Sequence, residues 1–171
     1  MDLRMKIAIY PGSFDPITSG HLNIIRRAST IFDQLIICVM VNAGKNPMFT
    51  LEERVELIRK VTDDLPNVTT EYSDELLADY ARKKGNCVIV KGLRAGSDFE
   101  NEFQMALINR KLNDQLDTMF LTAEHQYTYL SSSAVKELGM YDVDLSEFLP
   151  EEIIPDFQQK IIDIRQGGNK K

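Results

Sequence analysis

The sequence predicts an α/β fold in which a five-stranded parallel sheet is doubly wound, with helices on both faces. Short apolar runs rich in branched residues alternate with amphipathic helical segments along the 171 residues, as in successive β-α-β units. The runs are almost wholly apolar, which is typical of strands buried on both sides. The connections are short, and no repeat or linker divides the sequence, so residues 1–171 are predicted to form one domain.

The first half of the chain contains three of the expected strands: Lys6–Tyr10, Gln34–Val41 and Asn67–Tyr72. Between the first two, apolar residues from Leu22 to Phe32 recur at the spacing of a helix. A second helix is expected over Leu51–Val61, because Thr50 and Glu53 form the pattern of a capping box. Each of these helices connects two consecutive strands.

The second half continues the alternation. A helix over Glu75–Lys84 is expected to end at Gly85. The runs Cys87–Val90 and Asp117–Leu121 are the last two expected strands. Between them, Ser97 is expected to cap a helix whose inner face is formed by four apolar residues: Phe99, Phe103, Ala106 and Leu107.

The C-terminal part is expected to be helical as well. A short helix over Ser131–Leu138 precedes a helical extension at about residues 143–165, interrupted by Pro150 and Pro155. Residues 166–171 are expected to form a frayed tail. Together with the strands, these segments predict a Rossmann-like, doubly wound sheet with C-terminal helices.

Composition excludes several classes of function. The formal net charge is −6, whereas a general nucleic-acid binder usually carries a basic face. No apolar stretch approaches the roughly 20 residues of a membrane helix, and the N-terminus lacks the pattern of a secretory signal. Cys38 and Cys87 lie inside apolar runs and are expected to be buried, reduced thiols. We therefore expect a cytoplasmic protein that binds neither nucleic acid nor a membrane.

The loop after the first strand lies where ligands bind, because open parallel sheets bind them beyond the carboxyl ends of their strands. This loop, YPGSFDPITSGH, offers the hydroxyl of Ser13 and brings His21 to the start of a helix, where unpaired backbone N–H groups favour an anion. Gly12 permits close approach of the backbone to a ligand. For this loop alone, a strand–helix turn with a capping histidine is an equally good interpretation.

Three later loops lie on the same edge of the predicted sheet. Lys91 and Arg94 stand just before a helix N-terminus, where cations do not favour the helix itself, so an anionic ligand would explain them. Lys45 and the cluster Ser131–Ser133 can also contact phosphate oxygens. Taken singly, these residues are more typical of a solvated turn, a surface lysine and helix capping.

The sequence lacks the common motifs of other phosphate-binding sites and of a serine nucleophile. The chain has no G-x-x-x-x-G-K-[ST] loop, no G-x-G-x-x-G fingerprint and no G-x-S-x-G nucleophile elbow. His125 has no histidine or cysteine at metal-binding spacing. No general base is evident either.

Together the loops resemble the nucleotidyltransferase superfamily, in which a T-x-G-H motif ends the first loop; here the motif is Thr18–His21. Within that superfamily the sequence resembles the bacterial phosphopantetheine adenylyltransferases, because three further segments occur in the same order: NAGKNPMFTLEER, KGLRAGSDFENEFQMALINR and YTYLSSSAVKE. The resemblance covers about residues 7–150. A T-x-G-H motif alone is unspecific, whereas four ordered motifs on ligand-side loops are specific.

The resemblance implies transfer of the adenylyl group of ATP to 4′-phosphopantetheine, with dephospho-coenzyme A and pyrophosphate as products, in coenzyme A biosynthesis. The acceptor's ionised phosphate attacks the α-phosphate of ATP in line, so neither a covalent intermediate nor a general base is needed. The resemblance also implies Mg²⁺ held mainly by the ATP phosphates, a homohexamer, and coenzyme A as an inhibitor.

Roles for individual residues follow from the same resemblance. The implied catalytic residues are His21, Lys45 and Arg94, with His21 stabilising the transition state. The implied phosphopantetheine contacts are Ser13, Lys45, Leu77 and Lys91. The implied ATP contacts are Ser13, Phe14, His21, Gly92, Leu93, Arg94, Glu102, Tyr127, Thr128, Tyr129, Leu130, Ser131, Ser132 and Ser133.

The sequence departs from the family pattern at Lys91, at Ser13, where others have threonine, and at Lys136, where the family often has arginine; three alternatives also remain. Lys91 stands where many members of the family have arginine, and an ammonium is a point charge rather than a bidentate fork. A nicotinamide-mononucleotide adenylyltransferase or a glycerol-phosphate cytidylyltransferase would share Thr18–His21, but the segments PMFTLEER and KGLRAGSDFE favour the pantetheine enzyme. A flavodoxin-like signalling module would need paired acidic residues after the first strand, where this chain has Pro11, Gly12 and Ser13.

Overall fold

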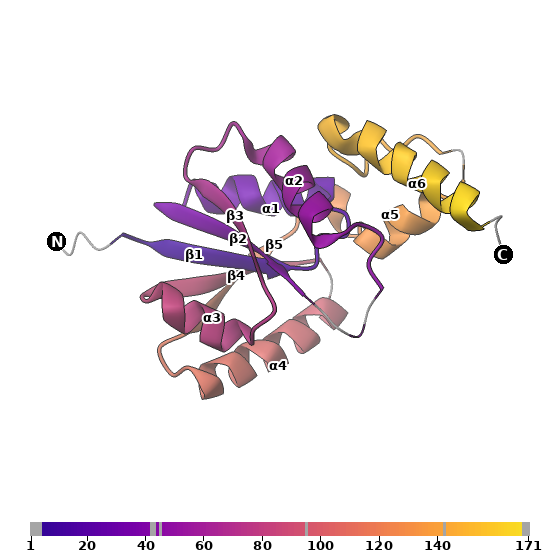
Figure 1. Ribbon diagram of the computed structural model, residues 1–171. Helices are drawn as coiled ribbons and strands as arrows, with labels where there is room; N and C mark the ends of the chain where they lie inside the picture. Colours follow the sequence, from indigo (N-terminus) through magenta and orange to yellow (C-terminus); the bar gives the residue numbers. More distant parts are fainter. Residues whose placement is uncertain (1–4, 42–43, 45, 95, 142, 169–171) are drawn as a thin grey trace.

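The computed structural model describes residues 5–41, 44, 46–94, 96–141 and 143–168, with the side chains of 97, 167 and 168 excepted. Five parallel strands form one sheet in the order β3-β2-β1-β4-β5. Their bounds are β1 (Ile7–Gly12), β2 (Gln34–Met40), β3 (Val68–Ser73), β4 (Cys87–Leu93) and β5 (Asp117–Thr122). The chain runs outward from β1 to β3 and then returns to lay β4 beside β1 (Figure 1). This order confirms the predicted doubly wound α/β fold.

Helices cover both faces of the sheet (Figure 1). One side carries four of them: α1 (Ser19–Ser29), α2 (Leu51–Thr62), α5 (Ser132–Leu138) and α6 (Ile154–Gly168). The other side carries two: α3 (Leu77–Lys84) and α4 (Gly96–Leu112). Two short 3-10 turns span His125–Tyr127 and Glu151–Ile153. Within the described ranges, no helix is long and apolar enough to cross a membrane.

The central strand β1 supplies side chains to two cores. Ala8 and Tyr10 pack with the residues of α1 and α2, whereas Ile9 packs with those of α3 on the opposite face. A parallel strand covered on both faces needs apolar residues at every position, which explains the uninterrupted run IAIY. Each large apolar side chain buried in this way contributes roughly 1.5–3 kcal/mol.

Three helix ends follow the caps that the sequence predicts. The hydroxyl of Thr50 accepts the N–H of Glu53 at 3.2 Å, and the Glu53 carboxylate accepts the N–H of Thr50 at 2.7 Å, so the predicted capping box is confirmed. α3 ends at Gly85, whose φ of 80° lies in the left-handed region. Ser131 caps α5 by accepting a hydrogen bond from the N–H of Ala134 at 3.1 Å.

Two boundaries near the edge of the sheet differ from the prediction. β4 continues beyond Val90 to Leu93, because it stays paired with β5 as far as Leu93 and Thr122. α4 begins at Gly96, so Ser97 lies inside the helix rather than before it. The segment KGL, expected as loop, is therefore the end of a strand.

α4 exposes apolar residues that the sequence predicts to face inward, and this prediction is wrong. Phe99 is 45% exposed, Phe103 46% and Leu107 55%. The rings of Phe99 and Phe103 stack on the surface with centroids 5.4 Å apart. Apolar residues occur on every side of α4, so their spacing does not define one inward face. Of the predicted set, Ala106 lines a cavity described below.

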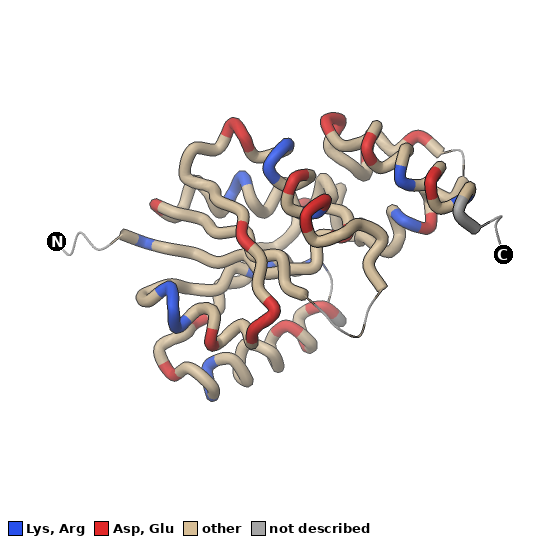
Figure 2. The backbone as a smooth tube through the Cα atoms, in the orientation of Figure 1, with Lys and Arg blue, Asp and Glu red and all other residues tan. Residues whose placement is uncertain are grey.

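α6 is longer and more regular than predicted. Pro155 lies in its first turn, where a missing N–H costs nothing, and does not interrupt the helix. The helix continues to Gly168, past the predicted start of the tail. Acidic residues occur along both α2 and α6 (Figure 2). Those that line the groove between the two helices are Glu52, Glu53, Glu56, Asp156 and Asp163. Lys60 and Lys160 fasten the two helices through ion pairs with Asp156 and Glu53, each worth up to about 1 kcal/mol.

Candidate active site

The sheet opens between its two central strands. β1 and β4 pair only as far as Ile9 and Ile89. Beyond that point β1 stays paired with β2 to Gly12, and β4 stays paired with β5 to Leu93. The strand order reverses at this junction, which is where open α/β sheets bind ligands. The carboxyl ends of β1 and β4 therefore border a crevice.

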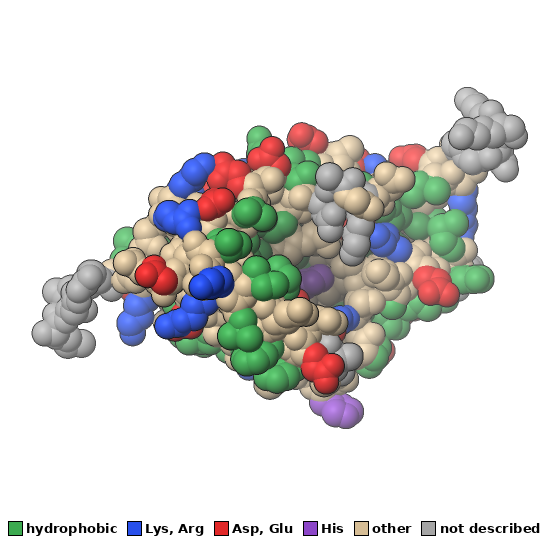
Figure 3. All heavy atoms as spheres, turned by 90° about the horizontal axis from the view of Figure 1, so that it is seen from below, with side chains coloured by type: hydrophobic (Ala, Val, Ile, Leu, Met, Phe, Trp, Pro, Cys, Tyr) green, Lys and Arg blue, Asp and Glu red, His purple; other side chains and the backbone are tan. Residues whose placement is uncertain are grey.

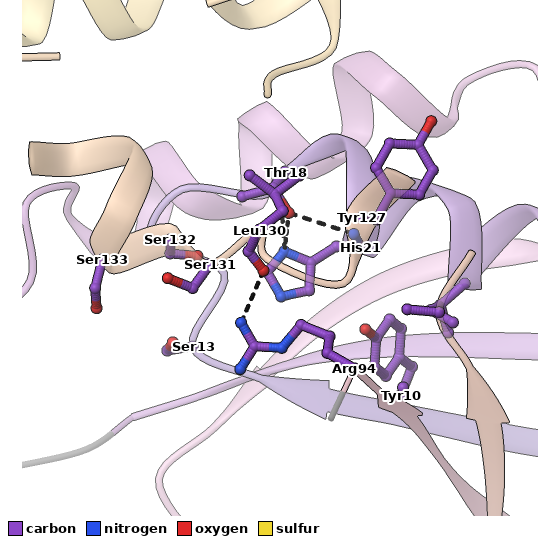
Figure 4. Close-up of a pocket in the computed structure, with 14 residues that line it drawn as sticks. Tyr10, Ser13, Thr18, His21, Arg94, Tyr127, Leu130, Ser131, Ser132 and Ser133 are labelled. Carbon is purple, nitrogen blue, oxygen red and sulfur yellow. Dashed lines mark hydrogen bonds between the residues drawn. The ribbon is translucent and has the colours of Figure 1, made fainter. Parts of the chain in front are cut away.

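A cavity of about 230 Å³, here called the first cavity, lies on the α1 side of the crevice (Figure 4). It is lined by Tyr10, Ser13, Thr18, Gly20, His21, Ile24, Gly92, Arg94, Ala123, Tyr127, Leu130, Ser131, Ser132 and Ser133. Of the chain's two histidines, one lies at the bottom of a hollow and the other projects from the surface (Figure 3). They are His21, which lines the cavity, and the exposed His125.

A second cavity of about 460 Å³ lies on the α3 and α4 side. It is lined by Pro11, Gly12, Ser13, Met40, Leu77, Ile89, Lys91, Glu102, Met105, Ala106, Asn109 and Thr118. Its walls are more apolar than those of the first cavity. Ser13 lines both cavities, so the two meet at the end of β1.

The helix cap of α1 fixes the ring of His21. The backbone N–H of Thr18 donates to Nδ1 of His21 at 3.1 Å, and the Thr18 hydroxyl lies 3.0 Å from the same atom. The N–H of His21 in turn donates to the Thr18 hydroxyl at 3.3 Å, which completes a capping box. Because Nδ1 accepts a backbone N–H, the neutral ring carries its proton on Nε2. The Nε2–H group is thus free to donate to a ligand.

The imidazole of His21 is neutral in the free protein. Burial, together with the charges of Arg94 and Lys91, lowers the pKa of His21 to about 4. Its ring meets the ring of Phe14 edge-on, with centroids 5.1 Å apart. Phe14 is buried beneath the cavity with φ of 46°, a conformation that costs a bulky residue about 1–2 kcal/mol. The surrounding contacts hold it there, and the support of His21 is correspondingly rigid.

Arg94 reaches the first cavity from the end of β4. Its Nε and Nη2 donate to Asp98 at 2.8 and 3.0 Å. Its Nη1 donates to the carbonyl oxygen of Leu130 at 2.7 Å (Figure 4). These contacts fix the plane of the guanidinium, whose further N–H groups can meet phosphate oxygens.

Lys91 lines the second cavity and is paired there. Its Nζ lies 3.1 Å from Oε1 of Glu102, and both side chains are partly buried. Glu102 is predicted to contact ATP, but it belongs to the second cavity and not to the first. In the free protein its carboxylate holds the Lys91 ammonium at the cavity wall.

Asp15, in the loop after β1, connects this loop to the loop after β2 and to helix α5 behind the site. Its buried carboxylate accepts the N–H groups of Met48 at 3.0 Å and Phe49 at 2.8 Å, in the loop after β2. It also accepts a hydrogen bond from Nζ of Lys136, on α5, at 2.8 Å. Burial alone would raise the pKa of Asp15, but these hydrogen bonds and the charge of Lys136 outweigh it and lower that pKa.

Two further contacts hold the backbone of the loop after β1. The buried Arg54 donates from Nη1 to the carbonyl oxygen of Ser13 at 3.0 Å, and from Nε to that of Thr50 at 3.3 Å. The hydroxyl of Ser132 donates to the carbonyl oxygen of Pro16 at 2.8 Å. The backbone that presents Ser13 is therefore fixed from both α2 and α5.

The structure gathers most of the predicted site residues. Nine of the residues expected to contact ATP line the first cavity: Ser13, His21, Gly92, Arg94, Tyr127, Leu130, Ser131, Ser132 and Ser133. Leu93, Thr128 and Tyr129 line neither cavity. Ser13, Leu77 and Lys91, expected to contact phosphopantetheine, line the second cavity. Lys45 lies outside the described residues. The roles of these residues remain predictions.

Other lining residues escaped the sequence analysis. In the first cavity they include Tyr10, Thr18, Ile24 and Ala123, and in the second they include Met40, Met105 and Asn109. The T-x-G-H motif contains Thr18, so its capping role was open to recognition from the sequence. Asn109 is one of many polar residues of α4, and nothing in the sequence distinguishes it.

Comparison with known families and proteins supports the assignment. A family model described as cytidylyltransferase-like matches residues 9–138. A relative from Alkaliphilus metalliredigens, named phosphopantetheine adenylyltransferase, is 55% identical over 156 residues, or 91% of this chain and 99% of the relative. A relative of the same name from Caldanaerobacter subterraneus subsp. tengcongensis is 51% identical over 156 residues, 91% of this chain and 98% of the relative.

Solved structures share the fold at lower identity. A bifunctional NMN adenylyltransferase/ADP ribose pyrophosphatase from Francisella tularensis superposes with a TM-score of 0.69 at 18% identity, over 94% of this chain and 50% of that one. A nicotinic acid mononucleotide adenylyltransferase from Plasmodium falciparum, complexed with NaAD, superposes with a TM-score of 0.65 at 13% identity, over 94% and 96%. These likenesses show the fold alone. From the family match and the similar relatives, the chain belongs to the cytidylyltransferase-like family and, within it, to the phosphopantetheine adenylyltransferases.

Proposed function

We propose that this chain transfers the adenylyl group of ATP to 4′-phosphopantetheine, forming dephospho-coenzyme A and pyrophosphate in coenzyme A biosynthesis. One observation carries the proposal beyond family membership: a polar cavity and a more apolar cavity meet at Ser13, where the sheet opens. Two ligands bound in them would bring their phosphates together at the end of β1. Transfer between two phosphorylated molecules needs that alignment above all.

The first cavity suits a nucleoside triphosphate. His21 offers a neutral donor, Arg94 a cation, and Ser13 a hydroxyl. The hydroxyl of Ser131 already caps α5 and that of Ser132 already donates to Pro16. The serine cluster would therefore act mainly through Ser133 and through backbone N–H groups, which are good partners for phosphate oxygens.

The second cavity suits the pantetheine arm. The ammonium of Lys91 would meet the acceptor's phosphate, and Leu77, Met40 and Met105 would contact the apolar parts of the arm. Asn109 is only 7% exposed, yet its side-chain amide has no hydrogen-bond partner among the described residues. An amide of the acceptor would satisfy it, because buried polar groups are normally paired.

The reaction would be an in-line displacement at the α-phosphorus. An ionised oxygen of the acceptor's phosphate attacks, and the bond to the bridging oxygen breaks, so that its electron pair leaves with pyrophosphate. The nucleophile carries no proton to remove, which makes a general base unnecessary. The Nε2–H of His21 and the guanidinium of Arg94 would stabilise the charge on the α-phosphate oxygens in the transition state. The catalytic role of Lys45, which falls outside the described residues, stays a prediction from the family resemblance.

Mg²⁺ would bind together with ATP. Among the described residues, no group of three or more His, Cys, Asp or Glu side chains could hold a metal ion. The residues that line the first cavity offer hydroxyl and backbone groups and no carboxylate. This lining fits an ion held mainly by phosphate oxygens and water, as Mg²⁺ often is. Bound in that way, it would neutralise charge on the triphosphate.

We also propose that copies of this chain associate, as homohexamers in keeping with the family resemblance. Hydrophobic side chains gather on the face seen in Figure 3, and those of α4 include Phe99, Phe103, Leu107 and Ile108. Soluble proteins rarely leave such a patch in water. Molar mass from light scattering would report the assembly, and Phe103→Glu is expected to lower that mass. An unchanged mass in this variant would count against α4 as the interface.

Two smaller proposals follow from the acceptor. Coenzyme A carries the same pantetheine arm and would compete for the second cavity, so it would inhibit the reaction. The cytoplasm is the proposed location, because Cys38 and Cys87 are buried, unpaired thiols of the kind found in reducing compartments.

A panel of acceptors tests the proposed function. The purified protein is given ATP and Mg²⁺ with 4′-phosphopantetheine or nicotinamide mononucleotide, or CTP with glycerol 3-phosphate. Pyrophosphate release is followed, and product masses are measured. Release of pyrophosphate with the mass of dephospho-coenzyme A, for the pantetheine acceptor alone, is the expected result. Turnover with another acceptor only would overturn the proposed substrate, and no turnover with any would overturn the reaction class.

A further inference from the structure

Tyr10 lies in the wall of the first cavity but is not among the residues to which the family resemblance gives a role. It comes from β1, on the α1 side of the sheet, and is only 5% exposed. Its ring meets that of Phe14 edge-on with centroids 5.3 Å apart, and its centroid lies 6.4 Å from that of His21. The position of the ring is therefore fixed by packing.

The hydroxyl of Tyr10 has no hydrogen-bond partner in the part of the chain that the structure describes. In the described part of the chain, every side-chain polar atom that is wholly inaccessible does have a partner. The Tyr10 hydroxyl is therefore still accessible, and the first cavity is the space that it faces. Buried tyrosine hydroxyls are normally paired, so one that faces a cavity unpaired indicates a ligand.

The neighbours of Tyr10 indicate which part of a ligand it would meet. In Figure 4, the guanidinium of Arg94 separates Tyr10 from Ser13 and from the serines of α5. Ile24 and Gly92 line the cavity beside Tyr10, and neither residue is charged.

Gly92 brings the backbone of β4 close to this end. A Cβ atom there would lie 3.0 Å from Cγ1 of Ile24 and 3.6 Å from the Tyr10 hydroxyl oxygen. A glycine thus keeps open the uncharged space beside Tyr10. That space fits the nucleoside half of ATP better than its phosphates, which the hydroxyls and Arg94 suit.

We propose that the Tyr10 hydroxyl forms a hydrogen bond with the nucleoside part of ATP and thereby contributes to nucleotide recognition. This inference rests on the proposed function. A neutral hydroxyl can both donate and accept, which suits the uncharged nitrogen and oxygen atoms of a base or a ribose.

The electrostatics of the cavity agree with a neutral hydroxyl. Burial, with a smaller contribution from Glu102, raises the pKa of Tyr10 well above its ordinary value, although Arg94 opposes the shift. Tyr10 therefore keeps its proton at all physiological pH values. The hydroxyl adds no charge that would balance a phosphate.

The variant Tyr10→Phe tests this inference, because it removes the hydroxyl and keeps the ring. Calorimetric titration in the presence of Mg²⁺ compares ATP with tripolyphosphate, which lacks the nucleoside. We expect ATP to bind about tenfold more weakly to the variant and tripolyphosphate to bind equally well. The melting temperature should not fall, since no hydrogen bond of the free protein is lost.

Tyr80→Phe provides a matched control. Tyr80 is also buried, but its hydroxyl donates to Glu71 at 2.8 Å and lines neither cavity. This variant should melt at a lower temperature and bind ATP normally. The two variants are thus expected to show opposite patterns of stability and affinity.

The outcomes separate this inference from the proposed function. Wild-type affinity for ATP in Tyr10→Phe would overturn the inference, while formation of dephospho-coenzyme A by the wild type would leave the proposed function intact. An equal loss of affinity for ATP and tripolyphosphate would also overturn it, because the contact would then be to the phosphates. Failure of the wild type to form dephospho-coenzyme A would instead overturn the proposed function.

Discussion

The two cavities that meet at Ser13 are held in different ways. Loops form much of the wall of the first, and buried groups fix them from behind: Thr18 orients His21, Asp15 connects two loops and helix α5, and Arg54 holds the carbonyl of Ser13. Strand and helix surfaces form the second, where the pair Lys91–Glu102 is the ion pair at the wall. A transition state needs donors fixed in advance, whereas a flexible arm mainly needs apolar area. The difference suggests that the rate depends on the first cavity and acceptor affinity on the second.

The largest effect should come from His21. In His21→Ala, kcat is expected to fall by 10²–10³, or about 3–4 kcal/mol of barrier, because a donor to the transition state is lost. The KM for ATP should change far less. Steady-state kinetics with varied ATP separates the two quantities. His125→Ala is the control, since that histidine is exposed and lines neither cavity.

His21→Gln separates chemistry from helix capping, because glutamine is itself favoured at this position of a capping box. It should fold as stably as the wild type and still lose turnover. Near wild-type turnover in both variants would show that the first cavity does not set the rate.

Asp15 should have the next largest effect, on stability. In Asp15→Asn, three donors lose a charged acceptor, and the free energy of unfolding is expected to fall by about 2–3 kcal/mol. Urea denaturation measures the change. Asp98→Asn removes a carboxylate from a more exposed pair with Arg94 and should cost less than about 1 kcal/mol. An equal loss of unfolding free energy in the two variants would show that the buried contacts of Asp15 stabilise the first cavity no more than an exposed ion pair does.

Stability should also depend on pH through His21. Its pKa falls from an ordinary 6.5 to about 4 on folding, so between these values the unfolded chain binds more protons than the folded one. The free energy of unfolding should therefore rise with pH across this window, by about 3 kcal/mol, and this contribution should be lost as pH falls toward 4. Urea denaturation of the ligand-free protein at several pH values measures the slope. His21→Gln should lack it, and an identical slope in that variant would assign the effect to another group.

The smallest effect should be specific to the second cavity. In Lys91→Met, the KM for 4′-phosphopantetheine is expected to rise about tenfold, since a charge-assisted contact to phosphate is lost. The KM for ATP should stay nearly constant. Lys91→Arg keeps the charge and should recover most of the affinity. A change in the KM for ATP of the same size would mean that the two cavities are not separate in function.

The sequence predicted the order of strands and helices because most of the strands carry continuous apolar runs, as in IAIY of β1. It failed at α4, where apolar residues surround the helix and no period marks an inward side. Residues such as Phe103 look like core in the sequence and lie on the surface of the single chain. Only tertiary packing, or contact with another copy, decides between those outcomes.

The sequence located loops that border the cavities, but it did not show which cavity each side chain lines. The ligand-side loops were found from turn residues and cations near strand ends, and Ser13, His21 and Arg94 do share one cavity. Glu102, which is expected to contact ATP, lines the second cavity, and the sequence could not show this because the direction that a helical residue faces depends on how the helix lies on the sheet. Tyr10 was overlooked because an apolar strand gives a tyrosine an ordinary reason to be there.

The role proposed for His21 in catalysis depends on the N-cap of α1. The hydrogen bonds by which Thr18 starts the helix also hold the ring that would face the reacting phosphate. Unfolding of that single turn would release the imidazole, and the enzyme would lose activity although the sheet stays folded. Amide hydrogen exchange at His21 would therefore report, on a residue scale, the fraction of molecules ready to react.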